Sequence, residues 1–275
     1  MLKTRVITAI VLLAVLLPIL FLLPPIYIGI FFLLAVVVAA WEWSRLLNPQ
    51  ASRSASLYAF FCLVIIIFLL AMQNVAWQFA LLLLAVIFWF FLAPFILAKG
   101  MRVSLDKLRP FYVVLGLILL PATWFALVFL RELGLVFLLS TIALVWVADI
   151  GAYFVGKAFG RRKLAAQISP GKSIEGAIGG LLLCYGYALL CIFYLPFESS
   201  IFGAWAIRFG WVPTFIMVTV LTGFSIIGDL FESQLKRMAG VKDSSHLLPG
   251  HGGVLDRVDA LIPTMPIAAL LAGLV

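Results

Sequence analysis

The sequence predicts an all-α, polytopic integral membrane protein with about nine transmembrane helices and a cytoplasmic N-terminus. Hydrophobic residues make up 65% of the 275-residue chain and charged residues only 11%, whereas soluble domains are about 45–50% apolar. Long apolar runs recur along the whole chain, and a transmembrane helix needs roughly 20 such residues. No linker is long enough to separate domains, so we expect one transmembrane domain over residues 1–275, with the half that carries the polar motifs at about 134–275.

The apolar runs set the positions of the expected helices. We place them at about residues 6–23, 26–40, 57–72, 75–97, 111–130, 134–155, 174–195, 212–230 and 255–275. The first run lacks an Ala-x-Ala cleavage site, which indicates an uncleaved first span rather than a signal peptide. Pro24-Pro25 joins it tightly to the second run, and Gln73-Asn74 joins the third run to the fourth.

The cations alternate between the two sides of this arrangement. With the N-terminus inside, all of the 19 Lys and Arg residues except Arg131 and Arg208 lie on the cytoplasmic side, as positively charged loops usually do. We therefore expect a multi-pass protein of the cytoplasmic (inner) membrane, with its C-terminus outside. The formal charge of +8 fits contact with anionic membrane lipids, and no nucleic-acid-binding module is visible.

Polar residues concentrate between positions 233 and 259. The glycines of Pro249-Gly250-His251-Gly252-Gly253 can turn backbone N–H groups toward an anion. The other polar residues that mark the segment as a site are Ser233, Lys236, Arg237, Lys242, Asp256, Arg257 and Asp259. The alternative is an ordinary basic loop between two spans. Carboxylates beside cations and glycines favour a site for a phosphate and its metal.

Two further carboxylates lie inside apolar spans. Asp149 shares a helix face with Tyr153, and an intramembrane Asp usually faces a protein interior or a watery cavity. Asp229 shares a face with Ser233 and Lys236. A hydrogen bond between helices is the alternative role for Asp149.

Asp256 and Asp259 share the first turn of the last expected helix, where capping of the helix N-terminus could by itself explain them. Ser169-Pro170 breaks the chain and leaves Lys172 and Ser173 near another helix N-terminus, which can hold a phosphate.

These residues carry a resemblance to a known family. The spacing from Ser233 to Asp259 resembles the C-terminal signature of the phosphatidate cytidylyltransferases, also called CDP-diacylglycerol synthases. A second block, over residues 149–160 and 168–176, resembles the same family. The resemblance implies that the enzyme joins CTP and phosphatidic acid to give CDP-diacylglycerol and pyrophosphate, with Mg²⁺ required and the active site near the cytoplasmic face.

The resemblance also implies residue roles. It assigns Mg²⁺ to Asp229, Asp256 and Asp259. Phosphoryl-type transfer needs mainly positioning and charge neutralisation, so we expect Lys236, Arg237 and Lys242 to stabilise the pyrophosphate. The expected substrate-binding residues are Asp149, Tyr153, Ser169, Lys172, Ser173, Ser233, His251, Gly252, Gly253 and Arg257.

Two questions stay open at this point. A secondary transporter of an anionic substrate, using Asp149 and Asp229, is the alternative function. The spacing Gly176-x-x-x-Gly180 permits close helix packing, either in a homodimer or within one chain.

Overall fold

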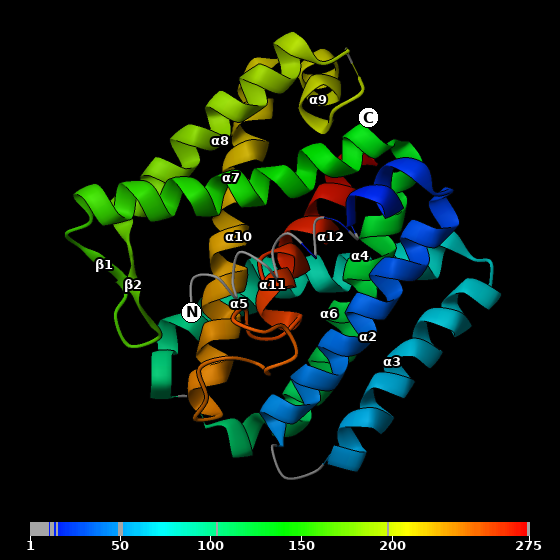
Figure 1. Cartoon of the computed structure of the whole chain (residues 1–275), viewed down its shortest axis with the longest axis vertical. Helices are drawn as coiled ribbons and strands as arrows, with labels where there is room; N and C mark the ends of the chain where they lie inside the picture. Colours follow the sequence, from blue (N-terminus) through cyan, green and yellow to red (C-terminus); the bar gives the residue numbers. More distant parts are fainter. Residues whose placement is uncertain are drawn as a thin grey trace.

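The computed structural model describes residues 11, 14, 16–48, 52–102, 104–196 and 198–273, and it is built almost entirely of helices (Figure 1). In chain order the elements are α2 (Pro25–Leu47), α3 (Ser52–Ala71), α4 (Val75–Ile87), the π-helical turn η1 (Phe88–Leu92), α5 (Ala93–Lys99), the 3₁₀ turn η2 (Gly100–Arg102), α6 (Leu105–Leu133), α7 (Leu135–Phe159), β1 (Lys163–Ala165), β2 (Ser169–Ser173), α8 (Ile174–Tyr194), α9 (Ile201–Phe209), α10 (Trp211–Met238), α11 (Leu255–Val258) and α12 (Leu261–Ala272).

Seven helices in the described part of the chain are long and apolar enough to cross a membrane: Pro25–Leu47, Arg53–Ala71, Val75–Arg102, Leu105–Leu133, Leu135–Phe159, Ile174–Tyr194 and Trp211–Met238. A polytopic membrane protein is therefore confirmed. Most of the first half of the expected span at residues 6–23 lies outside the described residues, so the total of nine and the orientation stay predictions.

The second span is longer than expected. It was placed at residues 26–40, yet α2 continues to Leu47. Its last turns pack against α6, where the Trp43 Nε1 donates to the Tyr112 carbonyl oxygen at 3.0 Å. Polar atoms such as this indole N–H remain inside the helical layer because they find partners there.

The expected span at residues 75–97 contains a π-helical turn. Within η1, the N–H of Ala93 donates to the Phe88 carbonyl, five residues back. Pro94 follows directly, and a proline both lacks an N–H and clashes with the carbonyl four residues earlier. Widening the helix by one residue accommodates that clash.

The last expected span is broken, which corrects the prediction of one helix over residues 255–275. α11 ends at Val258 and α12 begins at Leu261. Pro263 explains the break, since its ring excludes a regular hydrogen bond to the carbonyl of Asp259. At this point α10 comes very close: a Cβ on Gly228 would lie 2.6 Å from the Asp259 carbonyl oxygen.

Two elements were not expected. Residues 163–173 form an antiparallel β-hairpin, in which Lys163 pairs with Ser173 and Ala165 with Ser169, so the all-α prediction holds apart from this two-stranded sheet. α9 lies between the spans expected at residues 174–195 and 212–230, and the Ser200 hydroxyl caps its first turn by accepting from Gly203 N at 3.1 Å.

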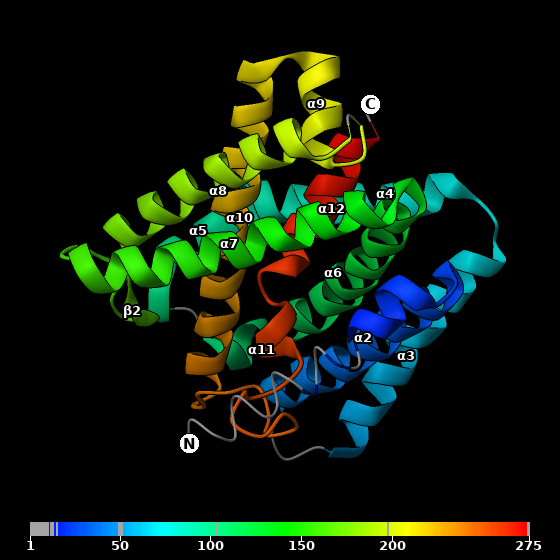
Figure 2. The ribbon, with the colours of Figure 1, turned by 45° about the horizontal axis from the view of Figure 1, so that its top comes forward.

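α7 and α8 lie side by side (Figures 1 and 2) and meet through glycines. A Cβ on Gly176 would lie 2.7 Å from the Ala152 carbonyl oxygen, and one on Gly180 would lie 2.7 Å from that of Ala148. The Gly176-x-x-x-Gly180 spacing therefore packs within the chain, and it gives no support for a homodimer.

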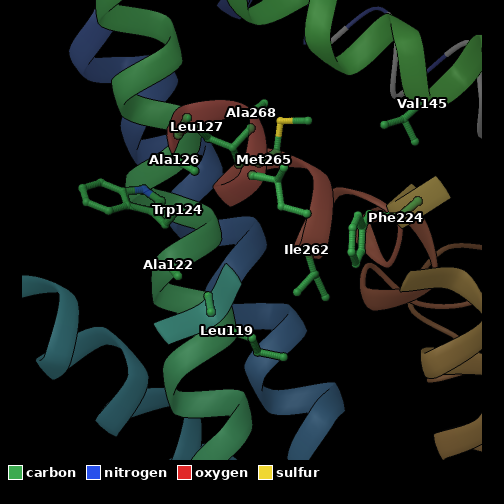
Figure 3. Close-up of a cluster of buried hydrophobic side chains, with 14 of the residues drawn as sticks. Leu119, Ala122, Trp124, Ala126, Leu127, Val145, Phe224, Ile262, Met265 and Ala268 are labelled. Atoms are coloured by element: carbon green, nitrogen blue, oxygen red, sulfur yellow. The ribbon is translucent and has the colours of Figure 1, made fainter. Parts of the chain in front are cut away.

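A buried apolar cluster holds α12 in place (Figure 3). Ile262, Met265 and Ala268 of α12 lie between Leu119 and Leu127 of α6 on one side and Phe224 and Val145 on the other. Because α11 leads directly into α12, this cluster fixes the position of the polar segment before it. Figure 2 shows α11 and the loop from α10 at one end of the helical bundle.

Candidate functional site

The loop of residues 239–254, which we call the catalytic loop, joins α10 to α11 and turns back on itself. Gly250 and Gly252 have φ values of 76° and 81°, which side chains with a Cβ rarely adopt. Leu248 N donates to the Gly252 carbonyl at 2.8 Å, and His251 N donates to the Leu248 carbonyl at 2.8 Å. These turns carry Gly253 back beside the start of α11.

Asp256 accepts hydrogen bonds from several groups of the catalytic loop. Its Oδ2 accepts hydrogen bonds from Gly253 N at 2.7 Å, Ser244 N at 2.9 Å and Ser244 Oγ at 2.8 Å. Its Oδ1 pairs with the Lys236 Nζ at 2.5 Å. Burial raises the pKa of this carboxyl group, but Lys236 and the Gly253 and Ser244 hydrogen bonds outweigh burial and hold the pKa below its usual value. The carboxylate is therefore ionised at neutral pH.

Lys236 lies between two carboxylates. Besides Asp256 it pairs with Glu232, one helical turn earlier on α10. The side chains are 12% exposed for Lys236, 5% for Asp256 and 2% for Glu232. A buried charge is costly unless it is paired, and this single lysine pairs with a buried carboxyl group on each side.

A second lysine–carboxylate pair lies nearby. Lys172 of β2 reaches Asp229 of α10, with 2.6 Å between Nζ and Oδ2. The Ser233 hydroxyl donates to the other oxygen, Oδ1, at 3.2 Å. Asp149 of α7 faces the same place, since Lys172, Asp229 and Arg257 are its electrostatic neighbours. Three segments far apart in the sequence thus place their charged groups together.

Asp259 joins this cluster at the break between α11 and α12, outside the candidate spans. Burial and the nearby Asp229 carboxylate raise the pKa of Asp259 to about 8. Such repulsion between carboxylates is relieved by a bound cation. Asp229 and Asp259 therefore have the right chemistry for a divalent metal.

By themselves the carboxylates do not form a closed metal site. In the part of the chain that the structure describes, no three His, Cys, Asp or Glu side chains are arranged to hold an ion. Mg²⁺ is often bound by only one or two carboxylates together with substrate phosphates and water. The residues fit that mode, with Asp229 and Asp259 the freer ligands, because Asp256 Oδ2 already accepts three hydrogen bonds.

Several expected substrate ligands have contacts within the protein. The Ser173 hydroxyl accepts from Gly176 N at 3.1 Å and caps α8. Arg257 donates through Nε and Nη2 to the His251 carbonyl, at 3.0 and 2.7 Å. Arg237 donates to the carbonyls of Ile168 and Val241, both at 3.4 Å, and so links the β-hairpin to the catalytic loop.

Other expected site residues differ in exposure. Tyr153 is largely exposed on α7 and Lys242 is exposed on the catalytic loop, whereas Ser169 on β2 is half-buried. The His251 Nδ1 is buried and makes no hydrogen bond with the described residues.

Two buried carboxylates were missed from the sequence as parts of the site. Glu232 was not assigned to the site, and Glu42 lies beyond the expected end of the second span. Glu42 is 0% exposed and accepts hydrogen bonds from the catalytic loop and the start of α11. The sequence signal that could have indicated this residue was a single carboxylate between two tryptophans, in Trp41-Glu42-Trp43.

The whole chain resembles known proteins. The sequence profile of the Cytidylyltransferase family matches residues 3–275. The chain belongs to this family. It is 39% identical over 273 residues to the phosphatidate cytidylyltransferase of Pseudomonas aeruginosa, covering 98% of this chain and 97% of that protein. The protein of the same name from Haemophilus influenzae is 37% identical over 294 residues, covering 97% and 96%, and that from Staphylococcus haemolyticus is 33% identical over 276 residues, covering 98% of each.

Membership of the cytidylyltransferase family confirms the resemblance inferred from two motifs and extends it. Those motifs lie within residues 149–176 and 233–259, whereas the family match begins at residue 3. It therefore includes α2, whose Glu42 contacts the catalytic loop. The family match of this cytidylyltransferase therefore covers the N-terminal helices as well as the motifs.

Proposed function

We propose that this cytidylyltransferase transfers the cytidylyl group of CTP to phosphatidate, giving CDP-diacylglycerol and pyrophosphate. Full-length identity of 39% to a phosphatidate cytidylyltransferase is the observation that carries the proposal. The paired lysines and carboxylates at one end of the bundle supply a site of suitable chemistry. No observation favours the transporter alternative.

The reaction needs positioning more than acid–base catalysis. A phosphate oxygen of phosphatidate attacks the α-phosphorus of CTP, and the bond from that phosphorus to the bridging oxygen of pyrophosphate breaks. The second pKa of a phosphate monoester is near 6, so the nucleophile is already an anion at neutral pH. We therefore assign no general base, and charge stabilisation carries the rate.

The cations of the site have different proposed roles. Lys236, held by Glu232 and Asp256, is positioned to stabilise charge on the leaving pyrophosphate, with Arg237 and Lys242 beside it. Lys172, paired with Asp229, would orient a substrate phosphate. The Gly252 N–H and the His251 imidazole would donate to phosphate oxygens, while the Gly253 N–H donates to Asp256.

We further propose that Mg²⁺ is required. Asp229 and Asp259 would hold it together with substrate phosphates and water, and Asp256, whose Oδ1 is paired with Lys236, would add its negative charge to the site. When bound, the ion would neutralise charge on the nucleotide phosphates. Asp149 would add negative charge nearby, and Tyr153, Ser169, Ser173, Ser233 and Arg257 would line the substrate site. Homodimerisation stays a prediction.

One assay tests the reaction. Detergent-purified protein receives CTP labelled at its α-phosphate, phosphatidate and Mg²⁺, and we expect labelled lipid together with unlabelled pyrophosphate. EDTA should abolish the product, and excess Mg²⁺ should restore it. Absence of labelled lipid from folded wild-type protein, with Mg²⁺ present, would refute the activity.

The active site should face the cytoplasm. Gln234 Nε2 donates to the carbonyls of Ile96 and Gly100, at 3.2 and 2.6 Å, which places the end of α5 beside the end of α10. Single cysteines at positions 99 and 163 should therefore resist a membrane-impermeant maleimide in intact cells, whereas one at position 131 should react. The native cysteines are buried and give little background. External labelling at positions 99 and 163 would reverse the proposed orientation.

A further inference from the structure

We infer that Glu42 of α2 is a positioning residue that holds the catalytic loop in its working conformation. It lies outside both motifs and outside the cluster assigned to the substrates. The inference rests on the proposed reaction, because the loop it holds carries the groups assigned to that reaction. It adds a residue from the N-terminal half of the chain to the residues that shape the proposed active site.

The contacts of Glu42 join α2 to residues more than two hundred positions away. Oε1 accepts from Val254 N at 3.1 Å and from Ser245 Oγ at 2.5 Å. Oε2 accepts from Leu255 N at 2.6 Å and lies 3.3 Å from Ser244 Oγ. In the described chain no Lys or Arg pairs with this fully buried carboxylate. Neutral donors from the catalytic loop and from the first residue of α11 therefore compensate the negative charge of Glu42.

The same loop supplies donors to Asp256. Three successive N–H groups are divided between the two carboxylates: Gly253 N donates to Asp256, and Val254 N and Leu255 N donate to Glu42. The single Ser244 hydroxyl proton lies nearer Asp256, at 2.8 Å, than Glu42, at 3.3 Å. If the loop backbone moved where it contacts Glu42, the Gly253 N–H that donates to Asp256 would therefore move as well.

The packing at this contact leaves no spare room. A Cβ on Gly253 would lie 2.3 Å from Glu42 Oε1 and 2.2 Å from Ser244 Oγ. The backbone of the catalytic loop thus lies directly against the carboxylate of α2. This explains why the chain needs glycine at position 253, independently of any phosphate.

An amide cannot replace this carboxylate. Each oxygen of Glu42 receives one backbone N–H, so a glutamine in either orientation would turn its NH₂ group toward a backbone donor. A serine hydroxyl can rotate to accept a hydrogen bond, but a backbone N–H cannot. Glu42→Gln keeps the size of the side chain and should nevertheless release the loop.

Activity of the full-length protein is the first measurement. A displacement of about 1 Å in a catalytic group can cost on the order of 10²-fold in rate, so we expect Glu42→Gln to lower kcat by roughly that factor. Because the substrate contacts themselves remain, the KM for CTP should change less than about threefold. Glu132→Gln, at an exposed position of α6, is the matched control and should keep wild-type kinetics.

Loop mobility is the second measurement, and it is independent of turnover. Leu247 is 50% exposed on the catalytic loop and the native cysteines are buried, so a nitroxide on Leu247→Cys reports this loop selectively. Glu42→Gln should narrow its spectrum, as a more mobile label does, while Glu132→Gln should not. If Glu42→Gln fails to fold, Ser245→Ala is the second variant. It removes one donor to Glu42 and also the acceptor of the Leu247 N–H, so a role for Glu42 requires a smaller fall in kcat as well as a narrower spectrum.

These measurements test the proposed reaction and the positioning role of Glu42 separately. Inactive wild-type protein would refute the reaction, while the nitroxide spectra would still test Glu42. Folded Glu42→Gln with kcat within about threefold of wild type, or with an unchanged spectrum, would overturn the positioning role. If Glu42→Gln does not fold, an unchanged spectrum or an unchanged kcat in Ser245→Ala would overturn it.

Discussion

Asp256→Asn is expected to lower kcat by on the order of 10³-fold, near the upper range for removing one electrostatic group from a reaction centre. The asparagine keeps the shape of the side chain but has one acceptor oxygen instead of two. If that oxygen takes the place of Oδ2, the amide NH₂ faces the Lys236 ammonium. If it faces Lys236, the NH₂ meets the N–H groups of Gly253 and Ser244. Both orientations also remove the negative charge proposed for Mg²⁺.

The fold should survive Asp256→Asn, because the apolar cluster around α12 (Figure 3) does not include this side chain. Monodisperse elution in detergent and unchanged membrane insertion would check this. Asp243→Asn is the matched control, since Asp243 is exposed on the same loop. Near wild-type kcat in folded Asp256→Asn would remove this residue from the reaction and from the metal site. The depressed pKa of Asp256 also predicts that it stays ionised between pH 5 and 8, so a pH–rate profile in that range should not show its titration.

Lys236→Gln is expected to lower kcat by on the order of 10² to 10³-fold at saturating CTP. A cation that strengthens its contact as charge builds on the leaving pyrophosphate acts in the transition state, so its loss lowers kcat as well as kcat/KM. Lys107→Gln is the matched control, because this lysine is exposed on α6 and makes no ion pair with the described residues. We expect Lys107→Gln to keep kcat within about threefold.

Removing Lys236 also leaves the buried Glu232 without its cation, which can be strongly destabilising. The double variant Lys236→Gln/Glu232→Gln removes both charges together and should fold better than the single variant. A slow, folded double variant would support the leaving-group role, because anchoring at a membrane surface contributes only about 1 kcal/mol per lysine. If the double variant and Lys242→Gln both keep kcat within about threefold, the two lysines are interfacial anchors.

The local pattern of the sequence predicted much of this molecule. Apolar run length identified the membrane class because a bilayer of fixed thickness needs helices of fixed length. The density of charge and glycine between residues 233 and 259 indicated a candidate site, because such residues are costly in an apolar chain unless they have a use. The spacing of those residues was enough to indicate the family.

The helix boundaries were less predictable where tertiary contacts decide them. The break at Asp259 depends on Pro263 and on the close approach of Gly228, and the extension of α2 to Leu47 depends on packing against α6. Gly176 and Gly180 were open to either intrachain or intermolecular packing until the position of α7 was known. A hydropathy pattern records which residues avoid water, and it does not record which surface they meet.

The sequence by itself determined that this chain is a membrane protein with charged chemistry near one end of its last helices. Only the tertiary structure decided that Lys172 pairs with Asp229, that Lys236 lies between Glu232 and Asp256, and that Glu42 holds the loop beside them. Charge type is a local property of a residue, whereas the choice of partner depends on contacts between segments as far apart as α2 and α11. Those contacts form only when the apolar packing of the helices brings the segments together.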